Sequence, residues 1–124
     1  MPSSQHMARI DFLGTGNAFM PHGRMHALAL LDECVLVDTP PTVLAQLRRC
    51  SISPSDLRHV LITHWHADHT FGFPFLLLDR KYISDPDFES ALSVHLRPGG
   101  RELFGNLCNL SLIHISEPTR LLSL

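Results

Sequence analysis

The sequence predicts an α/β fold, in which short strands alternate with helices around one hydrophobic core. Short apolar runs with β-branched side chains recur along the chain, and Cys34-Val35-Leu36-Val37 is one of them. Between these runs lie segments with a helix start signal followed by apolar residues at helical spacing, as in residues 39–49. With 124 residues, 44% hydrophobic residues and a net charge of −2, the chain is expected to form one domain or part of one.

The first expected strand covers residues 9–13 and ends at Gly14-Thr15-Gly16. A Gly-x-Gly after a strand, with Asp38 at the end of a later strand, resembles part of a dinucleotide-binding fingerprint. That fingerprint needs a helix directly after the glycines, whereas a proline and a glycine indicate a loop over residues 17–24. Phe19 occupies the third glycine position. The pattern therefore does not support a dinucleotide site.

Two further strands are expected over residues 26–31 and 34–37, joined as a hairpin, and Asp38 ends the second of them. The next segment, Thr39-Pro40-Pro41, predicts the start of a helix. The hydroxyl of Thr39 suits the capping position of a helix. Proline is tolerated in the first turn, because the N–H that it lacks would have no partner there. Arg48-Arg49 suits the end of this helix, since cations are favoured there by the helix dipole.

The second half of the chain continues the alternation. Pro74 is tolerated only near a helix start, so the helix expected over residues 70–82 should begin close to it. Its phenylalanine and leucine side chains are expected in the core or in a pocket wall, with a stacking platform as the alternative. The other expected elements are a helical turn at residues 53–56, a strand at 59–63, a turn at 84–89, a strand at 92–96 and a helix from residue 101.

Directly after the strand expected at residues 59–63, three imidazoles and one carboxylate fall within six residues. On a strand or extended loop, His64 and His66 point the same way because side chains alternate. Asp68 and His69 follow once the chain turns, so they can face a second ion. Imidazole and carboxylate suit Zn²⁺ and its first-row neighbours. We therefore predict a site for one or two metal ions; the alternative is a solvated loop that binds nothing.

Composition argues against several other classes of protein. No uniform apolar run reaches about 18 residues, and no charged-then-apolar leader opens the chain, so we expect a cytoplasmic protein without a membrane span. Cys34, Cys50 and Cys108 are odd in number and form no C-x-x-C pair, so reduced thiols are expected. Arg48-Arg49 and Arg80-Lys81 are isolated pairs, which do not predict an extended nucleic-acid surface. Bound ions would still attract a phosphodiester locally.

The H-x-H-x-D-H pattern resembles the signature of the metallo-β-lactamase-fold hydrolases. The longer string from Ile62 to Pro74 continues with F-G-x-P, which is similar to the ribonuclease Z branch rather than to the glyoxalase II or lactamase branches. Phe12-Leu13-Gly14-Thr15-Gly16 resembles the opening strand of that branch, and Ile52-Ser53-Pro54-Ser55-Asp56-Leu57 resembles the segment before its metal strand. The resemblance runs from about Ile10 to Tyr82.

The resemblance implies an αββα sandwich, with two sheets faced by helices, of which this chain would form the N-terminal half. It implies that His64 and His66 ligate one ion and that Asp68 and His69 ligate the second, with Asp68 also acting in catalysis by orienting the nucleophile. Asp38 would support the ligands by fixing the orientation of an imidazole, with a helix cap or turn role as the alternative. Two Zn²⁺ ions are implied, with Mn²⁺ or Fe²⁺ as alternatives, and the remaining family ligands come from further downstream.

Three hypotheses about function follow. The first is a dinuclear metal-dependent phosphodiesterase similar to ribonuclease Z, with RNA among its substrates and a homodimer for the intact protein. The second is a hydrolase of lactone, thioester or lactam bonds, and the third is a catalytically silent fragment. The F-G-x-P continuation favours the first over the second, and the absent downstream ligands favour the third for this polypeptide. The sequence departs from the ribonuclease Z pattern in two places: it has Thr39-Pro40-Pro41 instead of a glycine-rich turn, and Met25-His26 instead of Ser or Thr. The substrate of the intact protein could therefore be a phosphodiester other than that of ribonuclease Z.

Two parts are expected along the chain: residues 1–109 as a truncated domain and residues 110–124 as a non-native tail. Leu110 to Arg120 resembles, residue for residue, the translation of a transposase-adapter sequence used in sequencing libraries. A segment of that origin was never selected to meet this core, so we expect it to make few consistent contacts with residues 1–109. The alternative is a genuine helix or strand at the end of the domain.

Overall fold

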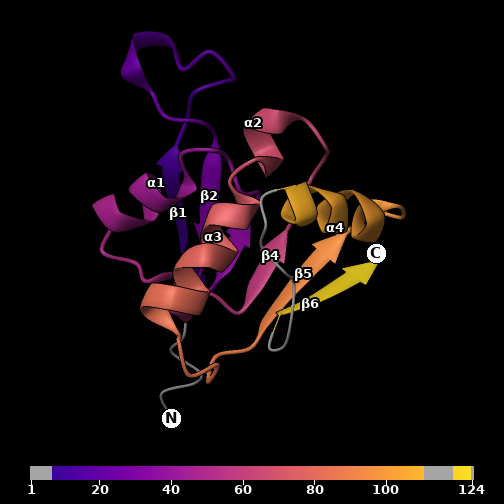
Figure 1. The fold of residues 1–124 in the computed structure, drawn as a ribbon. Coiled ribbons are helices and arrows are strands. Elements are labelled where there is room, and N and C mark those ends of the chain that lie inside the picture. The colour runs from indigo at the N-terminus through magenta and orange to yellow at the C-terminus, as the bar shows by residue number, and fades with distance from the viewer. Residues whose placement is uncertain (1–6, 111–118, 124) are drawn as a thin grey trace.

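Six strands form one mixed sheet in a computed structural model, which describes residues 7–110 and 119–123 (Figure 1). The strand order follows the chain, from β1 to β6. The first three strands pair antiparallel and the remaining pairs are parallel. The strands are β1 (Ile10–Gly14), β2 (Leu28–Leu31), β3 (Val35–Val37), β4 (His59–Leu61), β5 (Leu92–Leu96) and β6 (Thr119–Ser123).

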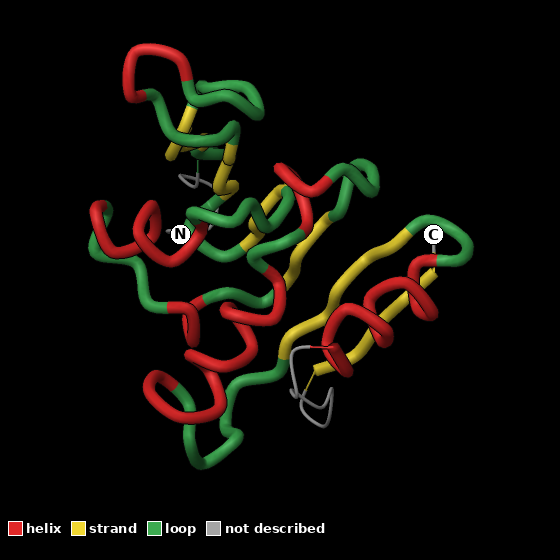
Figure 2. Tube along the Cα trace, turned by 45° about the horizontal axis from the view of Figure 1, so that its top comes forward, coloured by secondary structure: helices red, strands yellow, loops and turns green. Residues whose placement is uncertain are grey.

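Three helices pack on the same face of this sheet, and a short fourth helix lies beyond the strand ends (Figures 1 and 2). The alternation of strands and helices confirms the α/β class that the sequence predicts. None of the helices in the described residues is long and apolar enough to cross a membrane. The helices are α1 (Val43–Arg49), α2 (Ala67–Thr70), α3 (Phe73–Asp79) and α4 (Gly100–Leu110), with 3-10 turns at Pro21–Gly23 and Pro54–Asp56 and a π-helical turn at Arg80–Ser84.

The hydrophobic core lies between the sheet and its three packed helices. One row of directly opposed residues crosses the four central strands, and each of its side chains is completely buried. Burial of a side chain of this size contributes about 1.5–3 kcal/mol, so this row is a main source of stability. It comprises Leu30, Leu36, Val60 and Val94, beneath Leu47 of α1, Leu76 of α3 and Phe104 of α4.

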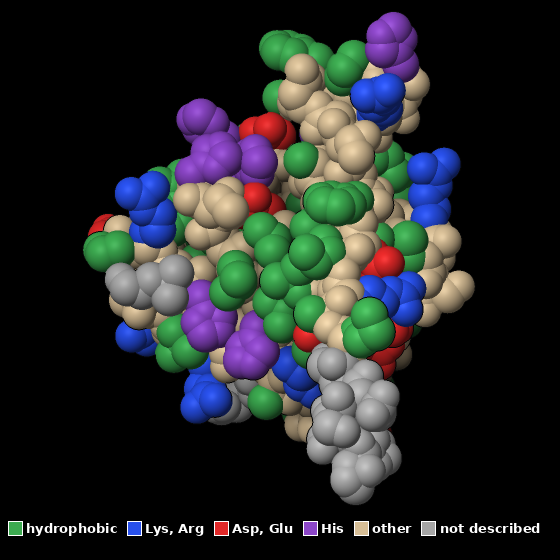
Figure 3. Space-filling model, turned by 180° about the vertical axis from the view of Figure 1, so that it is seen from behind, with side chains coloured by type: hydrophobic (Ala, Val, Ile, Leu, Met, Phe, Trp, Pro, Cys, Tyr) green, Lys and Arg blue, Asp and Glu red, His purple; other side chains and the backbone are tan. Residues whose placement is uncertain are grey.

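The opposite face of the sheet carries the strand residues that alternate with those of the buried row. Viewed from that side, hydrophobic side chains gather over the middle of the sheet (Figure 3). Phe12 is 73% exposed and Ile10 is 58% exposed on β1. His59 on β4 and His95 on β5 also belong to this face, with their ring nitrogens Nδ1 and Nε2 3.0 Å apart. We refer to this surface as the open face.

The glycines at the end of β1 are explained by a close approach of the backbone. A Cβ added at Gly14 would overlap the carbonyl oxygen of His26 and the side chain of Gln46. Gln46 is completely buried and donates to the carbonyl oxygens of Leu13 and His26 at 3.3 and 2.7 Å. The segment that follows is a loop, with only the turn Pro21–Gly23, as expected. The glycine pattern therefore serves packing of the chain against α1.

The predicted capping role of Thr39 is wrong. Helix α1 begins at Val43, and Thr42 occupies the capping position without a side-chain hydrogen bond. Thr39 is instead tied to the segment around α2, since its N–H donates to the carbonyl oxygen of His69 at 2.8 Å and its carbonyl accepts from Gly72 at 2.9 Å. These long-range backbone bonds use the groups that would have opened a helix.

The helix predicted in residues 70–82 begins close to Pro74, as expected, because α3 starts at Phe73 and continues directly into the π-helical turn Arg80–Ser84. The preceding residues 67–70 form a separate short helix, α2. The break falls at Gly72, where an added Cβ would overlap the carbonyl oxygen of Pro40. Pro74 lies in the first turn of α3, where its missing N–H costs no hydrogen bond. The close contact of Gly72 with Pro40 therefore lies where α2 and α3 are separated.

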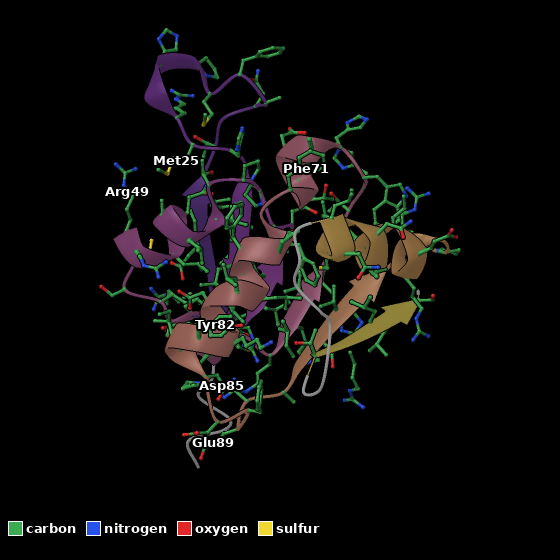
Figure 4. The ribbon with its side chains drawn as sticks, in the orientation of Figure 1. Met25, Arg49, Phe71, Tyr82, Asp85 and Glu89 are labelled. Carbon is green, nitrogen blue, oxygen red and sulfur yellow. The ribbon has the colours of Figure 1, made fainter. Side chains whose placement is uncertain are left out.

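The end of the sheet away from α2 is held by polar contacts. Ser53 and Asp56 form the reciprocal capping box of the predicted helical turn. Asp85 accepts from the N–H groups of Glu89 and Ser90 at 2.9 and 3.0 Å, which forms the expected turn, and Figure 4 shows Asp85 and Glu89 far from Phe71 beside α2. Arg80 is buried and donates to the carbonyl oxygen of Pro54 at 2.7 Å.

The three cysteines are free, as expected. Cys108 is buried in the core, and this burial raises the pKa of its thiol to about 11. A thiol with that pKa carries little thiolate at neutral pH, so it is a packing residue rather than a nucleophile.

The C-terminal segment differs from expectation in one respect. Residues 119–123 form β6, which pairs in parallel with β5 from Leu92↔Thr119 to Leu96↔Ser123. The expectation of few consistent contacts is therefore wrong for these five residues. Residues 111–118, which carry most of the resemblance to an adapter, lie outside the described residues. The interpretation of residues 110–124 as non-native stays a prediction.

Candidate metal centre

The predicted metal residues lie at the carboxyl ends of two adjacent parallel strands. Asp38 directly follows β3, and residues 62–66 lead from β4 into α2, which lies above the ends of the strands (Figure 1). Ligands of open α/β sheets bind outside the carboxyl ends of the strands, because several loops converge there. The local order of strand, loop and short helix therefore brings chemically active side chains to one end of the sheet.

The four residues of the motif are brought together in space. The ring of His64 lies 4.6 Å from the ring of His66 and 4.0 Å from the ring of His69, between centroids. Asp68 Oδ2 lies 3.3 Å from His69 Nε2. Within residues 7–110 and 119–123, however, no group of three or more His, Cys, Asp or Glu side chains is arranged ready to hold an ion. The side chains are neighbours, and their assignment as ligands stays a prediction.

Asp38 is the buried anchor of this cluster. The residue is only 5% exposed, and its carboxylate accepts three hydrogen bonds. The N–H of Thr63 donates to Oδ1 at 2.8 Å, while the Thr63 hydroxyl and His69 Nδ1 both bond to Oδ2 at 2.7 Å. Its backbone has a φ of 71°, in the left-handed region that Asp tolerates better than most residues. The side chain contacts a site histidine and the loop, rather than the amides at the start of a helix.

The contact with Asp38 determines how His69 presents its ring. A carboxylate carries no proton to donate, so His69 Nδ1 is the donor, and in the neutral ring His69 Nε2 carries the lone pair. That nitrogen faces Asp68 Oδ2 at 3.3 Å. Two ligand atoms about 2.1 Å from a tetrahedral Zn²⁺ are separated by roughly 3.4 Å. The donor types and their spacing therefore fit a divalent ion between Asp68 and His69.

The loop is also fixed from its apolar side. The Trp65 ring packs edge-on against Phe104 of α4, with centroids 5.9 Å apart. An added Cβ at Gly100 would lie only 2.5 Å from the Trp65 ring, so glycine is needed where α4 begins. The Thr70 hydroxyl donates to the carbonyl oxygen of His66 at 3.1 Å. These contacts hold the backbone between the first two histidines.

Sequence reasoning missed Thr63, Trp65 and Gly100 as parts of the centre. The contact between Thr63 and Asp38 joins residues 25 positions apart, and no periodicity relates them. The sequence did offer one signal for Thr63, because a residue with a hydroxyl group lies between the end of a buried strand and the first histidine. Trp65 gave a weaker signal, since a lone tryptophan in a polar motif suggests an anchor in the core.

Comparison with known proteins supports these observations. The sequence matches the family described as "Anti-Pycsar protein Apyc1" over residues 8–97, which include the whole cluster. It is 30% identical over 115 residues to a ribonuclease Z of Methanocaldococcus jannaschii, covering 90% of this chain and 35% of that protein. The chain therefore spans about a third of the length of this relative.

Solved structures give the same picture of the fold. The short form of human tRNase Z (ELAC1) superposes with a TM-score of 0.73 at 24% identity, over 93% of this chain and 44% of that one. A diphosphatase from the PhnP family has a TM-score of 0.69 at 20% identity, over 94% and 51% of the two chains. Such identities establish the fold alone. The coverage of about half, and helices on one face of one sheet, confirm the expected N-terminal half of an αββα sandwich.

Proposed function

Because the chain belongs to the family of the anti-Pycsar protein Apyc1 and has the metallo-β-lactamase fold of ribonuclease Z-like proteins, we propose that the whole protein is a metal-dependent phosphodiester hydrolase. One observation carries this proposal. His64, His66, Asp68 and His69 meet at the carboxyl ends of β3 and β4, above the buried carboxylate of Asp38.

Each side chain has a proposed task. His64 and His66 hold one ion, Asp68 and His69 hold a second, and Asp38 keeps the proton on His69 Nδ1 so that Nε2 faces the metal. Divalent ions in such a centre lower the pKa of a bound water and neutralise charge on the phosphoryl oxygens. The carboxylate of Asp68 also accepts a hydrogen bond from the attacking water and thereby orients it. The nitrogen and oxygen donors suit Zn²⁺, with Mn²⁺ or Fe²⁺ as alternatives.

The names of the relatives and two departures in the sequence both bear on the class of substrate. The relatives named ribonuclease Z and tRNase Z make RNA the first phosphodiester to test. Two departures argue for a different phosphodiester, namely Thr39-Pro40-Pro41 after Asp38 and Met25-His26 in the preceding loop. The family match also carries a name other than ribonuclease Z. We therefore propose a phosphodiester outside the ribonuclease Z substrate range, with RNA as the reference substrate.

The 124-residue chain by itself is proposed to be inactive. The cluster offers four ligand side chains for two ions, and the chain spans 35% of its ribonuclease Z relative. A half-filled centre binds its second ion weakly, because each missing ligand removes a metal bond and leaves charge uncompensated. The open face of the sheet is the surface on which the rest of the fold would pack.

The test compares two polypeptides on one substrate. The 124-residue chain and the longer protein containing it are assayed with Zn²⁺ or Mn²⁺ on bis(p-nitrophenyl) phosphate and on RNA. We expect turnover of bis(p-nitrophenyl) phosphate, and weaker or no turnover of RNA, by the longer protein only. The turnover should be lost in His66→Ala and retained in His22→Ala, which removes an exposed loop histidine outside the cluster. A longer protein that hydrolyses lactones, thioesters or lactams but no phosphodiester contradicts the proposal. Turnover by the short chain that His66→Ala abolishes contradicts its inactivity.

A further inference from the structure

We infer that Thr63 is a positioning residue, which connects Asp38 to His64 so that one carboxylate sets the tautomer of two histidines in the metal centre. The inference rests on the proposed function and deepens it, since it concerns how this site is prepared for a metal. Its hydrogen bonds belong to the chain itself and exist without any ion.

The hydroxyl of Thr63 has two polar neighbours and one proton. Its oxygen lies 2.7 Å from Asp38 Oδ2 and 3.0 Å from His64 Nδ1. The carboxylate can only accept, so the hydroxyl proton is donated to Asp38. The remaining interaction of the hydroxyl is then as an acceptor, and His64 Nδ1 must carry the proton that it accepts. His64 Nε2 is left with its lone pair.

The same carboxylate oxygen acts on a second ring. Asp38 Oδ2 also accepts from His69 Nδ1 at 2.7 Å, which in the neutral ring leaves His69 Nε2 unprotonated as well. The two rings are neighbours, with centroids 4.0 Å apart. Asp38 therefore prepares the Nε2 atoms of both histidines, directly for His69 and through Thr63 for His64.

Hydrogen bonds from backbone N–H groups hold Thr63 and Asp38 in place relative to each other. The Thr63 N–H donates to Asp38 Oδ1 at 2.8 Å, while the Asp38 N–H donates to the carbonyl oxygen of Leu61 at 2.7 Å. Threonine is stiff at χ1 because it is branched at Cβ. A hydrogen bond to a carboxylate is also about twice as strong as one between neutral groups. The hydroxyl is thus held in position although Thr63 itself is exposed.

His66 supplies an internal reference. In the part of the chain that the structure describes, its ring has no hydrogen-bond partner, and its carbonyl oxygen alone accepts bonds. The tautomer of His66 should therefore follow the solution preference of imidazole and should not respond to changes at Thr63. The three histidines therefore differ in how they depend on Thr63. His64 is bonded to it, His69 is bonded directly to Asp38, and the ring of His66 has no hydrogen bond among the described residues.

The experiment reads the tautomers in the metal-free chain by long-range ¹H–¹⁵N NMR at a pH where the rings are neutral. We expect His64 and His69 to be protonated at Nδ1 in the natural sequence. In Thr63→Val, which keeps the branched shape but removes the hydroxyl, His64 should move toward the Nε2–H form while His69 is unchanged. Thr63→Ser, which keeps the hydroxyl, should retain the Nδ1–H form of His64.

Zinc titration of the same variants gives a second readout. Loss of such a supporting contact typically weakens metal binding by 10–100-fold, so Thr63→Val should show about that loss and Thr63→Ser little change. Should Thr63→Val fold poorly, Thr63→Ala serves in its place, because the residue is exposed. Protonation of His64 at Nε2 in the natural sequence, or an unchanged tautomer in Thr63→Val, overturns the inference. Correct tautomers together with no zinc binding by the longer protein would instead count against the proposed function and leave the inference standing.

Discussion

Both faces of the sheet carry apolar side chains, but helices cover one face and leave the other open (Figure 3). Leu30 and Leu31 are neighbours on β2, yet Leu30 is completely buried beneath the helices whereas Leu31 is half-buried on the open face. The open face also exposes Phe12 and Ile10. A sheet face that meets only water is normally polar. The apolar open face therefore indicates a surface made to be covered, as expected for one sheet of an αββα sandwich.

The largest expected effect contrasts these two leucines. Leu30→Ala should lower the free energy of unfolding by about 3–5 kcal/mol, because it opens a cavity in a completely buried row. Leu31→Ala removes the same atoms from the open face and should cost less than about 1.5 kcal/mol. Urea unfolding followed by circular dichroism measures both. Equal losses would mean that the open face is covered in solution and would remove the contrast.

A second prediction concerns self-association. Phe12→Thr removes the most exposed large side chain of the open face and should shift the chain from aggregates or oligomers toward monomer. Its free energy of unfolding should stay within about 0.5 kcal/mol of the parent value, since the side chain is mostly in water. Sedimentation velocity is the measurement, and Phe19→Thr is the matched control, because Phe19 is 89% exposed on a loop outside the sheet. If both variants reduce association equally, the open face has no special role.

Local signals predicted the elements well, and long-range contacts explain the failures. The strand at residues 92–96 has the predicted bounds, and the predicted helical turn at residues 53–56 forms, closed by a capping box between Ser53 and Asp56. Thr39 failed as a cap because its backbone bonds to His69 and Gly72, which no local pattern reveals. In the centre, the H-x-H-x-D-H spacing identified the side chains that meet. The hydroxyl of Thr63 escaped notice because its partner is 25 residues away.

A third, smaller effect is expected from pH at the histidine pair of the open face. Burial, and then the charge of His59, lower the pKa of His95 below its ordinary 6.5. The unfolded chain therefore takes up a proton more readily, so this contribution to stability is present above about pH 6.5 and declines as the pH falls through and below that value. His95→Gln should reduce the loss of unfolding free energy between about pH 7.5 and 5.5, whereas His22→Gln should not. Parallel urea curves at both pH values for all three chains decide the point.

The smallest effect is expected from the C-terminal segment. Deleting residues 110–124 should change the free energy of unfolding by less than about 1 kcal/mol, because none of the side chains of β6 is fully buried and the strand lies at the sheet edge. Leu121 does pack partly against the core, so Leu121→Ser in the full chain is the control for that one contact. Zinc affinity should be unchanged, since Gly100 and Phe104, which contact Trp65, remain. A loss of several kcal/mol, or weaker zinc binding, would establish residues 110–124 as an authentic part of the fold and exclude their adapter origin.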